Sequence, residues 1–91
     1  MKRKGGIFVN SVYLTARSIT YAQRMARALG KNGVESRIER PEREITDKGC
    51  AYAVVISEGY VAEALEILSY NRLSPVKAVI KEDGEYRVLP I

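Results

Sequence analysis

The sequence has no histidine, no tryptophan and only one cysteine, Cys50. Without histidine there is no imidazole to serve as a near-neutral general base, to complete a catalytic triad or to help bind zinc. A single cysteine also excludes a disulfide within the chain. We therefore expect neither a bound metal nor a cofactor, and most familiar enzyme mechanisms are excluded.

Long apolar runs are absent as well. The apolar stretch Ile7–Val9 is interrupted by Asn10, which makes it far shorter than the core of a secretory signal or a membrane span. Of the 91 residues, 46% are hydrophobic and 29% are charged, values typical of one small globular domain. The sequence thus predicts a cytoplasmic protein with no membrane segment, in which a flexible basic segment (residues 1–10) precedes a single domain (residues 11–91).

Charge is unevenly distributed along the chain. The net charge is +4, but residues 1–48 contain 11 basic and 5 acidic side chains, whereas residues 49–91 contain 4 basic and 6 acidic ones. The first half therefore carries the basic surface, which permits an anionic partner. One face of an expected helix carries Thr20, Arg24, Arg27 and Lys31, which could bind an anion or form its solvated side.

In some segments every second residue is apolar, which indicates a strand. In others apolar residues recur every three or four positions, which indicates a helix. Ser18 and Ser57 are suitable N-caps for the first and the second helix, and Gly33 is a suitable stop for the first. Asp83-Gly84 is a strong signal for a hairpin turn. The expected strands cover residues 12–16, 34–39, 50–56, 76–81 and 86–89, and the expected helices cover residues 19–31 and 59–70. This order predicts an α+β, ferredoxin-like β-α-β-β-α-β sandwich with a C-terminal hairpin extension strand. Both helices would cover one face of an antiparallel sheet and leave the other face open.

The segment that leads to Cys50 has the strongest chemical character. A thiolate is a good nucleophile, and the nearby cations Lys48 and Arg43 would favour its formation. Gly49 would leave the sulfur approachable because it has no side chain. From the residues alone, a buried and inert cysteine at the start of a strand remains the alternative.

The same segment resembles a known family. A helix of the type Ala22–Leu29 and a Gly33-Val34 strand start precede a loop with a Pro-Arg-(Ile/Leu)-(Ser/Thr) pattern that leads into a Gly-Cys pair. The residues of that pattern here are Pro41, Arg43, Ile45, Thr46, Gly49 and Cys50. The chain resembles the DUF3343 family of selenium/sulfur carrier-like proteins over residues 12–80.

This resemblance implies a carrier function for Cys50. The thiol would accept a sulfur or selenium atom as a persulfide or selenosulfide and pass it on by thiol exchange, which needs no other catalytic group. The implied partners are proteins that donate and accept the sulfur or selenium atom.

A second interpretation is a single-stranded RNA-binding module. The stretch Lys48–Tyr52 matches four of five positions of the strand motif of RNA-recognition domains, which share the predicted order of elements. In such a site Tyr13 and Tyr52 would stack on bases. The phosphates would meet the side chains of Arg17, Arg37 and Lys77.

A third interpretation is a plain homodimeric interaction domain. If Val54 and Ile56 shared the outer sheet face with Tyr52, they would form an apolar patch that a second copy could cover.

Overall fold

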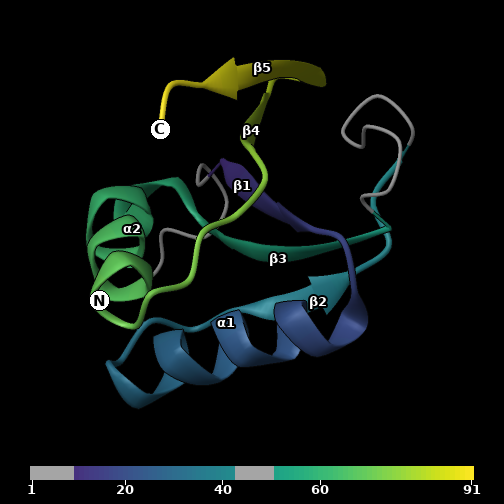
Figure 1. Ribbon diagram of the computed structural model, residues 1–91. Coiled ribbons are helices and arrows are strands. Elements are labelled where there is room, and N and C mark those ends of the chain that lie inside the picture. The colour runs from purple at the N-terminus through teal and green to yellow at the C-terminus, as the bar shows by residue number, and fades with distance from the viewer. Residues whose placement is uncertain (1–9, 43–50) are drawn as a thin grey trace.

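The computed structural model describes residues 10–42 and 51–91, which form one layer of helices packed on one antiparallel sheet (Figure 1). The strands are β1 (Ser11–Ala16), β2 (Arg37–Glu39), β3 (Tyr52–Ser57), β4 (Ala78–Glu82) and β5 (Glu85–Leu89). The helices are α1 (Ile19–Lys31), the short 3-10 helix η2 (Glu58–Tyr60) and α2 (Val61–Tyr70). In the described part of the chain, the strand order is β2-β3-β1-β4-β5 and every pair is antiparallel. The α+β class is confirmed, and the arrangement is consistent with a ferredoxin-like fold.

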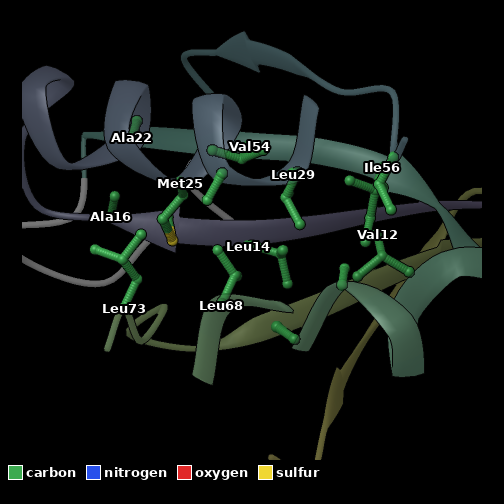
Figure 2. Packing of buried hydrophobic residues seen from close by; sticks show 14 of the residues in the cluster. Val12, Leu14, Ala16, Ala22, Met25, Leu29, Val54, Ile56, Leu68 and Leu73 are labelled. Carbon is green, nitrogen blue, oxygen red and sulfur yellow. The ribbon is translucent and has the colours of Figure 1, made fainter. Parts of the chain in front are cut away.

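The core lies between one face of the sheet and both helices. Because side chains alternate along a strand, Val12, Leu14 and Ala16 point from β1 to the same face. Met25 and Leu29 of α1 and Leu68 of α2 are fully buried in the same cluster (Figure 2). The predicted placement of both helices on one face of the sheet is therefore confirmed.

The limits of α1 follow from its caps. The Oγ atom of Ser18 accepts a hydrogen bond from the amide of Tyr21 at 3.1 Å, as expected for an N-cap. At the other end Gly33 has φ +84°, and the amide of Val34 donates to the carbonyl of Leu29 at 2.9 Å. This turn folds Val34 under the helix end, so β2 begins only at Arg37 and the expected strand over residues 34–39 is wrong in its first half.

The second helix starts differently from the prediction. Ser57 makes no side-chain capping hydrogen bond, and η2 separates it from α2. The Glu58 amide instead donates to the carbonyl of Asn10 at 2.8 Å, and the Asn10 side-chain amide donates to the Glu58 carboxylate at 3.0 Å. These contacts to the residue before β1 fix the start of the helical segment in place of a serine cap.

The side of the sheet that the β3 residues face contradicts the expected apolar patch on the outer face. Val54 pairs with Leu14 and is fully buried, and Ile56 pairs with Val12 and is 3% exposed. Both belong to the helix-side core, so they cannot form an apolar patch on the outer face.

The outer face of the sheet is also closed at its centre. Thr15 and Ala53 are fully buried, Val79 is 1% exposed and Val55 is 4% exposed. Central strands with apolar residues at both odd and even positions are typical of sheets that are buried on both faces. The expectation of an open second face is therefore wrong for the middle of the sheet.

The β4–β5 hairpin confirms the predicted Asp83-Gly84 turn, and Gly84 offers a clean test of it. Asp83 and Gly84 have φ +50° and +81°, as the tight turn requires, and a Cβ atom on Gly84 would meet no atom within 4 Å. Gly84→Ala should therefore lower the free energy of unfolding by about 1 kcal/mol through backbone strain alone.

The matched control is Gly30→Ala in α1, which also has open space around it. Alanine favours a helix over glycine, so this variant should raise the free energy of unfolding by about 0.5–1 kcal/mol. Urea denaturation of both variants measures the difference, and equal effects would contradict the assigned turn.

Candidate functional site at one end of the sheet

The predicted carrier residues Cys50, Gly49, Lys48 and Arg43 lie outside the described residues. The described chain stops at Glu42 and resumes at Ala51. Ala51 is exposed, and the next residue, Tyr52, pairs with Ala16 at the end of β1. Ala51, the first described residue after Cys50, therefore lies at the end of the sheet where β1 finishes and α1 begins.

Three cationic residues flank strands at that same end. Arg17 follows β1, Arg40 follows β2 and Lys77 precedes β4. The Arg40 guanidinium lies over the ring of Tyr52, with Cζ 5.3 Å from its centroid. Arg17 and Arg40 are exposed and Lys77 is half-buried, so this end of the molecule combines positive charge with solvent contact.

The backbone of Lys77 is held firmly in this arrangement. The fully buried hydroxyl of Thr15 accepts a hydrogen bond from the Lys77 amide at 3.0 Å, and the Thr15 amide donates to the Lys77 carbonyl at 2.9 Å. Close by, α1 begins at Ile19 with no acidic residue in its first turn. The positive end of the helix dipole therefore has no acidic residue beside it in that turn.

The described residues before Cys50 connect the two edges of the sheet. Glu42, beyond edge strand β2, accepts a hydrogen bond from the hydroxyl of Tyr86 on the opposite edge strand β5. Figure 1 shows the chain after β2 running past the ends of β1 and β3 towards β5. The ammonium group of Lys81 lies 5.6 Å from the centroid of the Tyr86 ring. The C-terminal hairpin thus contacts Glu42, the last described residue before Cys50.

A double-mutant cycle tests this contact. Tyr86→Phe removes the hydroxyl but keeps the ring beside Lys81, and Glu42→Gln removes the charged acceptor. Because the pair is exposed, we expect a coupling of about 0.5–1 kcal/mol in the free energy of unfolding, measured with urea on the four proteins. The control cycle pairs Tyr86→Phe with Glu85→Gln and should show no coupling. A Glu42 coupling near zero would mean that the contact is not made in solution.

The two tyrosines of the RNA interpretation are not brought together. Tyr13 pairs with Val55 and Val79 on the outer face, whereas Tyr52 packs against the helix-side core. They cannot form one stacking platform because they lie on opposite faces of the sheet. This geometry corrects the expectation of a shared platform.

Arg37, expected to contact a phosphate, lies beside an acidic residue of its own strand. It forms an ion pair with Glu39. The hydrogen bond to Glu39, together with its negative charge, raises the pKa of the Arg37 guanidinium. Arg37 pairs with Val55, which also pairs with Tyr13, so Arg37 and Tyr13 lie in one row across the outer face. Lys77 lies two residues before Val79, the β4 partner of Tyr13. The residues of the RNA interpretation are therefore divided between the two faces of the sheet, with Tyr52 on the helix side and Tyr13 and Arg37 on the outer side.

Sequence reasoning missed the roles of Arg40, Glu42 and Tyr86. Arg40 stacks on a tyrosine of the neighbouring strand, and Glu42 meets a residue 44 positions further along the chain. Neither contact leaves a local periodic signal, because both join residues that only the tertiary structure brings together. Among residues 10–42 and 51–91, no three His, Cys, Asp or Glu side chains cluster as metal ligands, and no helix is long and apolar enough to cross a membrane.

Comparison with known proteins assigns the chain to a family. No curated protein and no solved structure gives a significant match. A family model described as "Putative Se/S carrier protein-like" matches residues 11–80, from the first residue of β1 into β4, and so includes Cys50. Since this match covers more than half of the chain, the protein belongs to the family of Se/S carrier-like proteins.

Proposed function

We propose that this protein is a sulfur or selenium carrier whose cargo is held on Cys50. The observation that carries the proposal is the family match over residues 11–80, which contains the only cysteine of the chain. The fold adds support, because the described residues on both sides of Cys50 lie at an exposed, positively charged end of the sheet. Arg43, Lys48 and Gly49 are proposed to assist the thiol.

The proposed transfer is a thiol exchange, in which one S–S bond replaces another without net oxidation. The Cys50 thiolate attacks the outer sulfur of a persulfide on a donor protein, so that a new S–S bond forms as the donor's S–S bond breaks. The electron pair of the broken bond leaves with the donor sulfur as a thiolate. Delivery is the reverse step, in which an acceptor nucleophile takes the outer sulfur and Cys50 leaves as a thiolate. The same scheme with selenium gives a selenosulfide.

The electrostatics of the site favour such chemistry. Both the attacking group and the persulfide product are anions, and nearby cations stabilise an anionic sulfur. Arg17 and Arg40, at the same end of the sheet, contribute positive charge, as does the start of α1. A small domain without a deep active site can therefore supply what the exchange needs.

Carrier and RNA-binding functions are separated by two substitutions. For a carrier, Cys50→Ser should abolish sulfur loading, while Tyr52→Ala should leave the thiol in place. For an RNA binder, Tyr52→Ala should weaken single-strand binding by about 1–3 kcal/mol through lost stacking, and Cys50→Ser should have little effect. Sulfur loading and RNA affinity are measured on the same three proteins. Salt-sensitive RNA binding that depends on Tyr52, without sulfur loading, would contradict the proposal.

A further inference from the structure

Helix α1 presents an unusual charge distribution. Arg24, Arg27 and Lys31 are spaced by three and four residues, so they lie on one face of the helix and span about 10 Å along its axis. No acidic residue occurs anywhere in α1. The ion pairs found among the described residues, Arg37–Glu39 and Arg87–Glu82, involve none of these three cations.

The three cations lie along one side of a hollow in the surface. They line a cavity of about 230 Å³ together with Ala28, Asn71 and Leu73. Ala28 is 8% exposed and Leu73 is 5% exposed, so the hollow has an apolar lining beneath a charged rim. The turn that brings Leu73 here is fixed by a hydrogen bond of 2.8 Å from its amide to the carbonyl of Leu68.

We propose that this basic hollow of α1 is the docking surface for an acidic segment of a partner protein. Like charges held close together repel one another, and an anionic partner would relieve that repulsion. An arginine guanidinium group can bind a carboxylate through two parallel hydrogen bonds. A glutamate side chain also matches the lining, because its apolar stem can lie on Ala28 and Leu73 while its carboxylate meets the cations.

The surface chemistry favours a protein partner over a single-stranded nucleic acid. Base stacking contributes strongly to single-strand binding, and no aromatic ring lines the hollow. Tyr21, one turn before Arg24, is already engaged: Arg24 lies 5.8 Å from the centroid of its ring, and its hydroxyl accepts a hydrogen bond from the Ser74 amide at 2.7 Å.

The location suits a carrier. The turn after α2 leads into β4, whose start lies at the same sheet end as the residues that flank Cys50. Acidic residues Glu58, Glu63 and Glu66 lie instead on η2 and α2, so the helical layer carries opposite charges on its two sides. Such asymmetry would orient an approaching acidic partner towards α1. The identity of this partner as a sulfur donor or acceptor rests on the proposed function, whereas the binding itself does not.

Fluorescence anisotropy with a labelled hexaglutamate peptide tests the proposal on the full chain. Arg27→Glu should weaken peptide binding roughly tenfold, because it reverses a charge at the hollow. The matched control, Arg87→Glu on β5, changes the net charge equally and should alter binding by less than about twofold if the site is local. Thermal denaturation checks that both variants are folded, and Cys50→Ser should bind the peptide like the unaltered protein.

Several results would overturn the proposal. Equal weakening by Arg27→Glu and Arg87→Glu would indicate attraction by overall charge. Tighter, Arg27-dependent binding of a labelled oligouridine would assign the hollow to nucleic acid. Salt-sensitive self-association that Arg27→Glu removes would assign it to a second copy. Sulfur loading of Cys50 without any peptide binding would refute this docking surface and leave the carrier function standing.

Discussion

Replacing Leu14 with alanine is expected to lower the free energy of unfolding by about 3–5 kcal/mol. Leu14 is fully buried on β1, the central strand of the described sheet, and points between Met25 and Leu29 of α1 and Leu68 of α2 (Figure 2). Truncation removes apolar contacts and leaves a cavity that the two helices and three strands around it cannot readily fill. A domain of this size has a total stability of about 5–15 kcal/mol, so the loss is a large fraction of it.

The control for Leu14→Ala is Val88→Ala on the edge strand β5. Val88 is 59% exposed, and its truncation should change the free energy of unfolding by less than about 0.5 kcal/mol. Urea denaturation with Cys50 kept reduced measures both variants. Similar small effects for the two would contradict the central position assigned to Leu14.

Replacing Lys48 with glutamate is expected to slow alkylation of Cys50 at neutral pH. Removing a cation and adding an anion next to the thiol should raise its pKa. Below the pKa, the thiolate fraction falls in proportion, so a rise of one unit would slow the reaction roughly tenfold at neutral pH. Above both pKa values, the rates of the variant and the unaltered protein should converge.

The pH dependence of the alkylation rate separates this effect from a change in access to the thiol. A pKa effect shifts the profile towards higher pH, whereas a change in access lowers the rate at every pH. Lys31→Glu, on the far part of α1, is the control of equal charge change and should leave the profile in place. An unchanged profile in Lys48→Glu would contradict the role proposed for Lys48.

Local signals made the helical layer and the hairpin predictable. Ser18 and Gly33 bracket α1, and the observed helix Ile19–Lys31 agrees with the expected range. Asp83-Gly84 likewise specifies the turn before β5 because both residues tolerate positive φ. In these segments one or two residues determine the backbone geometry regardless of distant contacts.

The face assignment of β3 could not be predicted from its sequence. All four residues of the run Ala53–Ile56 are apolar, so no alternation of polar and apolar residues shows which of them face the helices. Only pairing with β1, where Leu14 lies opposite Val54, decides the assignment. This single ambiguity caused both the expected Tyr13–Tyr52 platform and the expected apolar patch to be wrong.

The surroundings of the cysteine segment were predictable only in part. The sequence indicated a loop rich in cations, but the contacts of Arg40 with Tyr52 and of Glu42 with Tyr86 join residues from different strands. Such pairs arise from tertiary structure and have no signature in residue spacing. The roles of Cys50, Gly49, Lys48 and Arg43 therefore remain proposals for experiment.

The intact mass of the native protein, after incubation with a cysteine desulfurase and cysteine, tests the carrier proposal most directly. The unaltered protein should gain the mass of one sulfur atom, and a reducing thiol should remove it, since a persulfide is cleaved by exchange. Cys50→Ser, treated in the same way, should keep its original mass. An unaltered protein that gains no sulfur, and whose Cys50 resists alkylation in the native state, would contradict the account and identify Cys50 as a buried structural residue.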